Sequence, residues 1–297
     1  MRYDIEFHHL EQFVAVARTG NFTRAAAELN LSQSSLSRAV QKLEDQIGQP
    51  LFERKPREVV LTDHGELFLE RAKEILKLAE DTFSALSEAG RHGRIRLGAI
   101  PTVAPYFLPR FLSSFAKANP DVSVIVQEDT TENLVKRCSH GEIDLAILAM
   151  PIIAKYLESE VLFDEELLLV VPADHELVSR DLITPEAVEE FPFVTLNEAH
   201  CLADNIASYC RQQSVQPVSV ERISQLTTVQ ELVALGHGVS IIPEMARQLD
   251  QSDRRVYRSF DAPEPMRTVA MLWNPYRYQS KWVKSMRDHL REFVSGE

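Results

Sequence analysis

The spacing of apolar residues in the first fifty positions follows the period of an α-helix, with repeats of three and four. It predicts one helix from about His9 to Arg18, a short Ala-rich helix from about Thr23 to Leu29, and a third helix in "LSQSSLSRAVQKLEDQIG". Asn21 and Ser32 suit the N-caps of the second and third helices, and Gly48 suits the end of the third. A short helix, a tight turn and a longer helix form a helix-turn-helix.

The third predicted helix has two contrasting faces. Its apolar face holds Leu36, Val40, Leu43 and Ile47. Its outward face is polar, and the candidate DNA-binding residues on it are Gln33, Ser34, Ser35, Ser37, Arg38 and Gln41. Short polar groups and an arginine can meet base edges and phosphates in a major groove. On periodicity alone, a small helical domain with a solvated face explains the pattern equally well.

The segment "LFERKPREVVLT" predicts a β-hairpin, because two short apolar runs flank a charged centre. Arg54, Lys55 and Arg57 at its tip are further candidate DNA-binding residues. Contacts from such a tip to backbone phosphates add affinity without reading the sequence.

A single long helix is expected from about Asp63 to Ala89, with Thr62 as its cap. A narrow apolar seam runs along it, formed by Phe68, Ala72, Ile75, Ala79 and Leu86. Such a seam is typical of a helix that packs on another helix, and the alternative is a helix lying on its own domain. The two glycines of "AGRHGR" then mark a domain boundary.

From Arg94 onward, short apolar runs alternate with helical stretches around Pro105 to Ala118 and Glu132 to His140. This βαβα order predicts parallel sheets covered by helices. The first sheet is expected to take residues 95–162 with the final strand and helix, and the second residues 163 to about 265. Two such lobes form a cleft, and ligands favour the carboxyl ends of the strands.

Threonines follow the first two strands of this region. Thr102 comes after the first, and Thr130 and Thr131 come after the second. A hydroxyl there can cap the following helix or contact a ligand, and both roles remain open.

Composition suits a folded protein of two or three domains, with 297 residues, 44% hydrophobic and 26% charged. Net charge is −12, but residues 1–62 hold eight basic and eight acidic side chains, so the deficit lies after residue 62. The N-terminus lacks a signal-peptide pattern, and the longest apolar run, Leu145 to Ala154, is shorter than the roughly 18 residues that cross a bilayer. A cytoplasmic protein without membrane contact is expected, and structural disulfides are uncommon in that compartment.

Two of the three cysteines, Cys201 and Cys210, lie nine positions apart in "HCLADNIASYCRQQ". A helix starting at about Leu202 places Cys201 at its N-terminus, where the helix dipole favours a thiolate. Nine residues of helix rise about 13.5 Å, whereas a disulfide needs Cα atoms within about 7 Å, so a bridge requires unwinding. Two thiols that merely pack are a second possibility, and a zinc site with His200 lacks a convincing fourth ligand.

The stretch "FVAVARTGNFTRAAAELNLSQSSLSRAVQKLEDQIGQPLFERKPREVVLTDHGE" resembles the winged helix-turn-helix of LysR-type transcriptional regulators. This resemblance implies an α/β protein with a DNA-binding domain over residues 1–62 and a linker helix for dimerisation over 63–92. An effector domain resembling periplasmic binding proteins would follow over 93–297. Its lobe I would take about 94–162 and 266–297, and its lobe II about 163–265.

Within that family, "AIPTVAPYFLP", "HCLAD", "ELVALGHGVSIIP" and "MRTVAM" resemble the OxyR-type hydrogen peroxide sensors. The resemblance implies that Cys201 is the peroxidatic cysteine and Cys210 the resolving one. It also places around the peroxide and the thiolate Thr102, Thr131, His200, Asp204 and Arg267. Ala199 departs from the glycine common before His-Cys, and Cys138 is expected only to pack.

The leading hypothesis is therefore a DNA-binding transcription factor, not an enzyme, that senses hydrogen peroxide and regulates, as an activator, oxidative-stress genes. Expected partners are promoter DNA, further copies of the chain in a homodimer or homotetramer, RNA polymerase, and a thiol reductant of glutaredoxin or thioredoxin type. No cofactor or metal is expected. A regulator that binds a metabolite in the effector cleft is the first alternative, and a thiol peroxidase is the second. A peroxidase has no need of a helix-turn-helix.

Overall fold

The computed structural model describes residues 5–54, 59–87, 93–197, 201–215 and 219–296. The chain divides into two compact units, residues 1–89 and 90–297. Among the described residues, no helix is long and apolar enough to span a membrane.

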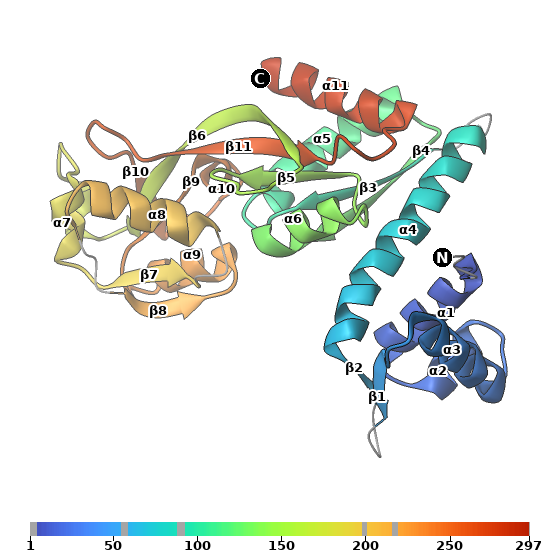
Figure 1. Cartoon of the computed structure of the whole chain (residues 1–297). Helices are drawn as coiled ribbons and strands as arrows, with labels where there is room; N and C mark the ends of the chain where they lie inside the picture. The colour runs from blue at the N-terminus through green and yellow to red at the C-terminus, as the bar shows by residue number, and fades with distance from the viewer. Residues whose placement is uncertain (1–4, 55–58, 88–92, 198–200, 216–218, 297) are drawn as a thin grey trace. The chain divides into compact units, whose positions relative to one another are not determined.

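The first unit contains the predicted helix-turn-helix and hairpin (Figure 1). Its elements are α1 (Phe7–Thr19), α2 (Phe22–Glu28), α3 (Gln33–Ile47), β1 (Phe52–Arg54), β2 (Val59–Leu61) and α4 (Asp63–Ser87). Asn21 Oδ1 accepts hydrogen bonds from the backbone N–H groups of Thr23 and Arg24, at 2.8 and 3.1 Å. Ser32 Oγ accepts one from Ser35 at 3.1 Å. Both predicted N-caps are therefore confirmed.

The start of α4 is fixed by side-chain and backbone contacts with the segment before β1. Thr62 Oγ1 accepts a hydrogen bond from the Gly65 N–H at 3.0 Å and donates one to the Pro50 carbonyl at 2.7 Å. A Cβ at Gly65 would lie 2.0 Å from the Leu51 carbonyl oxygen, so glycine alone permits this approach. The predicted Thr62 cap is confirmed.

Helix α4 carries two apolar faces rather than the single predicted seam. Phe68, Ala72 and Leu76 pack against the core of the first unit, which agrees with the alternative of a helix lying on its own domain. A different set is exposed by 46–66%, comprising Leu67, Ile75, Leu78 and Phe83. Phe68 of the predicted seam contacts the ring of Phe13 in α1, and Ala72 is buried in the same core, so these two residues follow that alternative. Packing of the exposed set on another helix stays a prediction.

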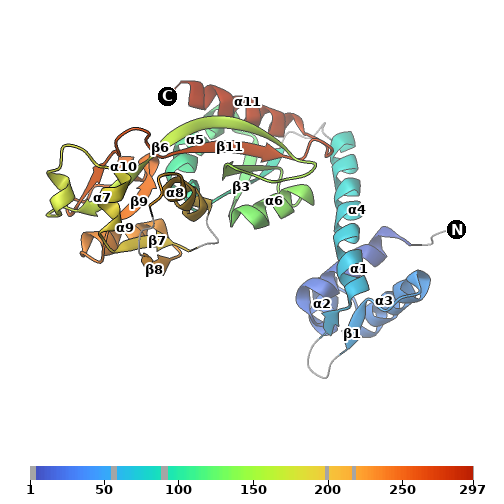
Figure 2. The same cartoon turned by 60° about the vertical axis from the view of Figure 1, so that its left-hand side comes forward.

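The second unit is an α/β structure (Figures 1 and 2). Its first part comprises β3 (Gly93–Ala99), α5 (Ala104–Ala118), β4 (Val122–Glu128), α6 (Thr131–Ser139), β5 (Leu145–Ala149) and β6 (Glu158–Pro172). Its second part comprises η1 (Glu176–Val178), α7 (Pro185–Glu189), β7 (Phe193–Leu196), α8 (Cys201–Gln212), β8 (Ser219–Ile223), α9 (Leu226–Ala234), β9 (Ser240–Pro243), α10 (Glu244–Gln248), β10 (Arg255–Arg258), β11 (Met266–Trp273) and α11 (Lys281–Ser295).

Strand pairing corrects the prediction of two separate parallel sheets. In the described residues, one seven-stranded sheet has the order β10-β6-β11-β5-β3-β4, with β9 also paired to β6. Only β3 with β4 and β3 with β5 are parallel in it, and β6 pairs antiparallel with β9, β10 and β11. The reason is that β6 is a single 15-residue strand that joins both halves, as Figure 2 shows. A small parallel pair, β7 with β8, is joined to the segment before β9 by a parallel bridge between Phe193 and Val239.

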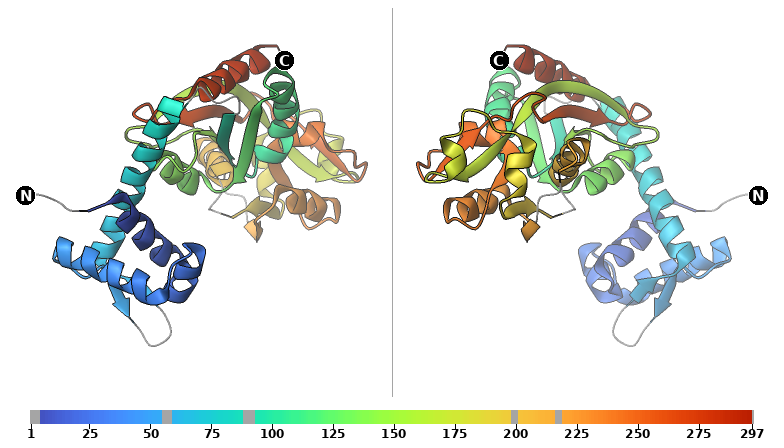
Figure 3. Two further views of the ribbon diagram at one scale, coloured as in Figure 1. Left: turned by 90° about the vertical axis from the view of Figure 1, so that its right-hand side faces the viewer. Right: turned by 90° about the vertical axis from the view of Figure 1, so that its left-hand side faces the viewer.

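Two hydrophobic cores lie in the second unit. The first core gathers buried residues between 95 and 162 and between 269 and 290, and the second core those between 167 and 260. In the first, α5 and α11 lie together on one face of the sheet and α6 covers the other (Figure 3). Strands β6 and β11 run side by side between the two cores.

Candidate functional site

The candidate DNA-binding face belongs to α3 and the hairpin. Leu36, Val40 and Leu43 are buried on the inner side of α3, as predicted. The exposed residues on its outer side are Gln33, Ser34, Ser35, Arg38 and Gln41, with Ser37 half-buried. The hairpin is confirmed by the antiparallel pairing of β1 and β2; Arg54 ends β1, while Lys55 and Arg57 lie outside the described residues.

Thr102 and Arg267, both predicted around the thiol, are joined directly. Arg267 Nη1 donates to Thr102 Oγ1 at 3.0 Å, and Nη2 donates to the Thr102 carbonyl at 3.1 Å. Both residues are buried, with 2% and 1% of their surface exposed. Helix capping by Thr102 was wrong, because the N-cap of α5 is Val103 and the Thr102 hydroxyl is bound to Arg267 instead.

The charge of Arg267 is balanced by Glu165, which the sequence did not single out. Arg267 Nε donates to Glu165 Oε1 at 2.7 Å, and its Nη2 lies 2.6 Å from the same oxygen. The two residues are opposite one another in the β6–β11 pairing. Glu165 Oε2 also accepts the backbone N–H of Met245 at 3.1 Å, near the start of α10. A buried guanidinium is thus held by a carboxylate, a hydroxyl and a carbonyl.

Thr130 and Thr131 differ in the two roles considered for them, helix capping and ligand contact. Thr130 is the N-cap of α6, and its side chain accepts from the Asn133 N–H. Thr131 is the first residue of that helix, and its buried Oγ1 has no hydrogen-bond partner among the described residues. A hydroxyl in that condition is available to a small polar molecule.

Helix α8 places the two cysteines as predicted, one at each end. Cys201 is its first residue, half-buried and packed against the first core, while Asp204 in the same turn is exposed. Asn205 Nδ2 donates to the Met150 carbonyl at 3.0 Å, so the start of α8 is bound to the chain that follows β5. Ala199 and His200 lie outside the described residues.

The other two thiols are buried. Cys210 is 8% exposed within the second core, and burial raises its pKa. Cys138 is 1% exposed, its Sγ lies 3.8 Å from the Leu272 carbonyl, and burial raises its pKa to about 12. The prediction that Cys138 only packs agrees with this burial. All three cysteines are free.

Glu165, Met245 and Asn205 were missed by sequence reasoning. The sequence does give one signal for Glu165, which lies in "FDEELLLVV", next to an apolar run. An acidic side chain that such a run buries needs a partner for its charge. No comparable signal marks Met245, whose backbone makes the bond. Asn205 lies at helical spacing from Cys201, on the same face of α8.

Two family models match the chain. The LysR substrate binding domain matches residues 88–295, and the bacterial regulatory helix-turn-helix protein of the lysR family matches residues 7–66. The chain belongs to the LysR family. Members of this family are DNA-binding regulators, so the thiol-peroxidase hypothesis is set aside.

Similar proteins extend the LysR assignment over the full length. A probable hydrogen peroxide-inducible genes activator of Mycobacterium leprae is 33% identical, over 97% of this chain and 94% of that protein. A full-length OxyR variant of Pseudomonas aeruginosa superimposes with a TM-score of 0.81 at 29% identity, over 98% of this chain and 96% of that one. A hydrogen peroxide-bound OxyR variant of Corynebacterium glutamicum superimposes with a TM-score of 0.65 at 30% identity, over 100% of this chain and 92% of that one. The LysR and OxyR-type resemblance and the predicted fold class are confirmed.

Proposed function

We propose that this LysR-family regulator senses hydrogen peroxide through a Cys201–Cys210 thiol/disulfide switch and controls oxidative-stress genes. The observation that carries the proposal is the position of two free thiols at the two ends of one helix. Support comes from the names of the full-length relatives, which are peroxide-inducible activators and OxyR proteins.

The chemistry needs only these two residues and the oxidant. The Cys201 thiolate attacks one oxygen of hydrogen peroxide, the O–O bond breaks, and hydroxide leaves to become water. Cys201 is then a sulfenic acid. The Cys210 thiolate attacks the Cys201 sulfur, the S–O bond breaks, a second water leaves, and the disulfide forms. Two electrons have passed from the thiols to the peroxide, and a dithiol reductant of thioredoxin or glutaredoxin type returns them.

The switch arises because α8 keeps the two sulfurs apart. Nine residues of helix separate their Cα atoms by about 13.5 Å along the axis, against the limit of about 7 Å for a disulfide. Cys201 packs against the first core and Cys210 lies in the second, where it is 8% exposed, so at least one of them must also leave its core. Formation of the bond therefore requires α8 to unwind and its surroundings to repack, which gives two discrete states.

The residues proposed to surround the peroxide are Thr102, Thr131, His200, Asp204 and Arg267. The unpartnered hydroxyl of Thr131 and the buried guanidinium of Arg267 support this proposal. A hydroxyl can orient the oxidant, and a guanidinium favours negative charge on a nearby sulfur.

The DNA-binding role is proposed for residues 1–62, with residues 63–92 pairing two chains and residues 93–297 holding the switch. On α3, the proposed DNA contacts are Gln33, Ser34, Ser35, Ser37, Arg38 and Gln41, and on the hairpin Arg54, Lys55 and Arg57. Paired chains would present two reading heads to two half-sites. A homotetramer on promoter DNA in the cytoplasm, acting on RNA polymerase, completes the proposal.

Peptide mapping under non-reducing conditions tests the switch. Reduced full-length protein is treated with stoichiometric hydrogen peroxide. In parallel, the DNA upstream of its own gene is footprinted with the reduced and the treated protein. We expect a Cys201–Cys210 peptide pair and a changed footprint, both lost in Cys201→Ser and both kept in the matched control Cys138→Ser. An unchanged footprint with no linkage contradicts the proposal, and a metabolite trigger would then leave induction intact in Cys201→Ser.

A further inference from the structure

A cavity of about 410 Å³ lies beside the Glu165–Arg267 pair, lined by α5, α10, α11 and the adjoining parts of β6 and β11. This volume is in the range of roughly 300–1,000 Å³ that is typical of small-molecule sites. Neither Cys201 nor Thr131, both described, lines it, so the cavity is separate from the candidate redox site. Glu165 and Met245, which the candidate site joins by a hydrogen bond, form part of its wall.

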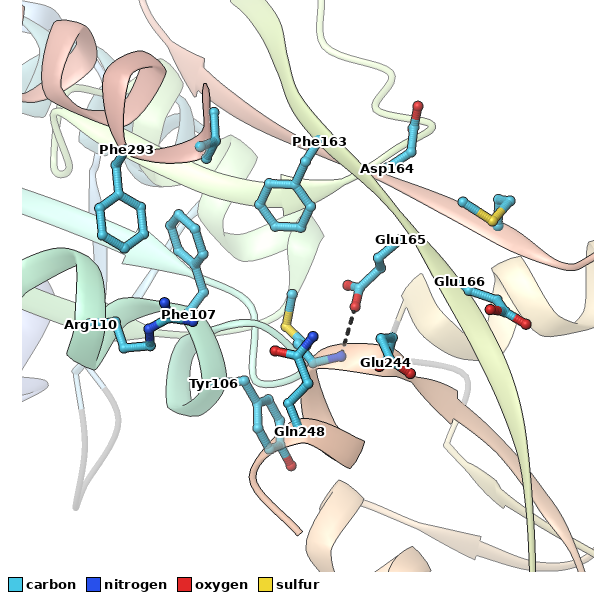
Figure 4. Close-up of a pocket in the computed structure, with 13 residues that line it drawn as sticks. Tyr106, Phe107, Arg110, Phe163, Asp164, Glu165, Glu166, Glu244, Gln248 and Phe293 are labelled. Carbon is cyan, nitrogen blue, oxygen red and sulfur yellow. Dashed lines mark hydrogen bonds between the residues drawn. The ribbon is translucent and has the colours of Figure 1, made fainter. Parts of the chain in front are cut away.

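One side of the cavity is aromatic. The ring of Phe107 lies with its centroid 5.5 Å from that of Phe163 and 5.8 Å from that of Phe293. Figure 4 shows the three rings gathered at one end of the space. Such a wall provides apolar surface for a ligand body and ring faces that attract a cation.

The other side is polar and acidic. Glu165 points toward the start of α10, where its carboxylate accepts the Met245 N–H (Figure 4). A carboxylate has about four acceptor positions. The described residues occupy Oε1 with Arg267 and one position of Oε2 with the Met245 N–H, which leaves Oε2 able to accept again. Glu244, the first residue of α10, adds a second carboxylate, paired with Arg247 at 2.7 Å.

The sign of the ligand follows from these groups. The carboxylates of Asp164, Glu165, Glu166 and Glu244 all belong to residues that line the cavity. Among the described lining residues, the one arginine, Arg110, lies by Phe107 at the far end from Glu165 (Figure 4). A ligand anion would face the buried Glu165 carboxylate, and like charges repel one another. A neutral O–H or N–H group could donate to Glu165 as well, but only a cation adds the opposite charge and the stronger, charge-assisted hydrogen bond.

We propose that this cavity binds an organic ammonium ion with an aryl or alkyl body. The body packs against Phe107, Phe163 and Phe293, and the ammonium donates to Glu165 and Glu244. Because Glu165 also holds Arg267 against Thr102, the ligand competes with Arg267 for one carboxylate. Binding is therefore coupled to the environment of the Cys201 thiol, a consequence that rests on the proposed peroxide function.

Titration calorimetry of the reduced full-length protein tests the site. The probe is 2-phenylethylammonium, and its matched controls are 3-phenylpropionate and 2-phenylethanol. We expect saturable binding of the ammonium, tighter by about tenfold than of either control. Phe293→Ala and Glu244→Gln should each weaken it by about tenfold, and the distant Glu176→Gln should not. Absent binding, equal binding of the three probes, or unchanged affinity in Phe293→Ala overturns the proposal.

The coupling has its own readout. Stopped-flow oxidation of the protein by peroxide is measured with and without saturating probe, and we expect the rate to change in wild type but not in Phe293→Ala. Saturable binding with an unchanged rate overturns the coupling. If peroxide oxidises no thiol pair at all, the proposed function fails, and the calorimetry still decides whether the cavity is a site.

Discussion

Replacing Glu165 by alanine should strongly destabilise the second unit. In wild type, the side chains of Arg267 and Glu165 are 0% and 8% exposed and lie 2.6 Å apart. Removing the carboxylate leaves a buried guanidinium without its counter-ion, which costs roughly 3–5 kcal/mol of unfolding free energy. With a urea m-value of roughly 2–3 kcal/mol per molar, the unfolding midpoint should fall by about 1–2 M.

A surface pair in the same unit gives the matched control. Arg291 and Glu160 make an ion pair of the same length, 2.6 Å, but their side chains are 40% and 36% exposed. Solvent screens this pair, so Glu160→Ala should cost only about 0–1 kcal/mol. Glu165 also accepts the Met245 N–H, and Arg291 keeps Asp288 as a partner, so the contrast between the two variants compares a buried, networked carboxylate with a surface one.

Urea unfolding followed by tryptophan fluorescence is the assay. The chain has two tryptophans, Trp273 and Trp282, and both belong to the second unit, so the signal reports that unit. Replacing both partners, Glu165→Met with Arg267→Met, should restore most of the lost stability because no buried charge remains. A Glu165→Ala variant no less stable than Glu160→Ala would refute the reasoning.

Three further outcomes are expected. Hydrogen bonds from Arg255 lower the pKa of Asp250 to about 2, so the second unit should lose about 2 kcal/mol as pH falls from about 4 to about 2. Asp250→Asn should remove that dependence in urea titrations, and parallel pH curves for the two proteins would contradict this. In Cys210→Ser, peroxide should leave Cys201 as a sulfenic acid that dimedone traps. If the free Cys201 thiol is lost rapidly and no dimedone adduct forms, Cys210 is not the resolving thiol. Arg38→Ala should weaken promoter binding and, if it contacts a phosphate, lower the slope of log affinity against log salt by about 1. An unchanged slope and affinity would place Arg38 off the DNA.

Local features were predictable from the sequence because their partners are close in the chain. The caps Asn21, Ser32 and Thr62 bond to backbone groups two or three residues away, and each was found where the pattern placed it. The first residue of α8 likewise depends on a few neighbouring positions.

Contacts between distant segments were not predictable in this way. The Thr102 hydroxyl is bound to Arg267, 165 residues later, which the run "AIPTVAPY" does not indicate. The 15-residue β6 was divided between two lobes because "DEE" interrupts its apolar pattern. Glu165 belongs to that interruption, but it is buried in an ion pair with Arg267. The acidic residue there does not indicate a loop.

The anchoring of α8 in both cores has a consequence for electron transfer. Its first residue packs against the first core and Cys210 lies in the second, so an oxidised chain must withdraw at least one of them. Packing energy lost in this way favours the dithiol form and raises the reduction potential of the pair, by about 30 mV for each 1.4 kcal/mol. Substitutions in either core, far from the sulfur atoms, should therefore change the peroxide threshold. Those that tighten the packing of the reduced form raise the reduction potential, and those that loosen it lower the potential.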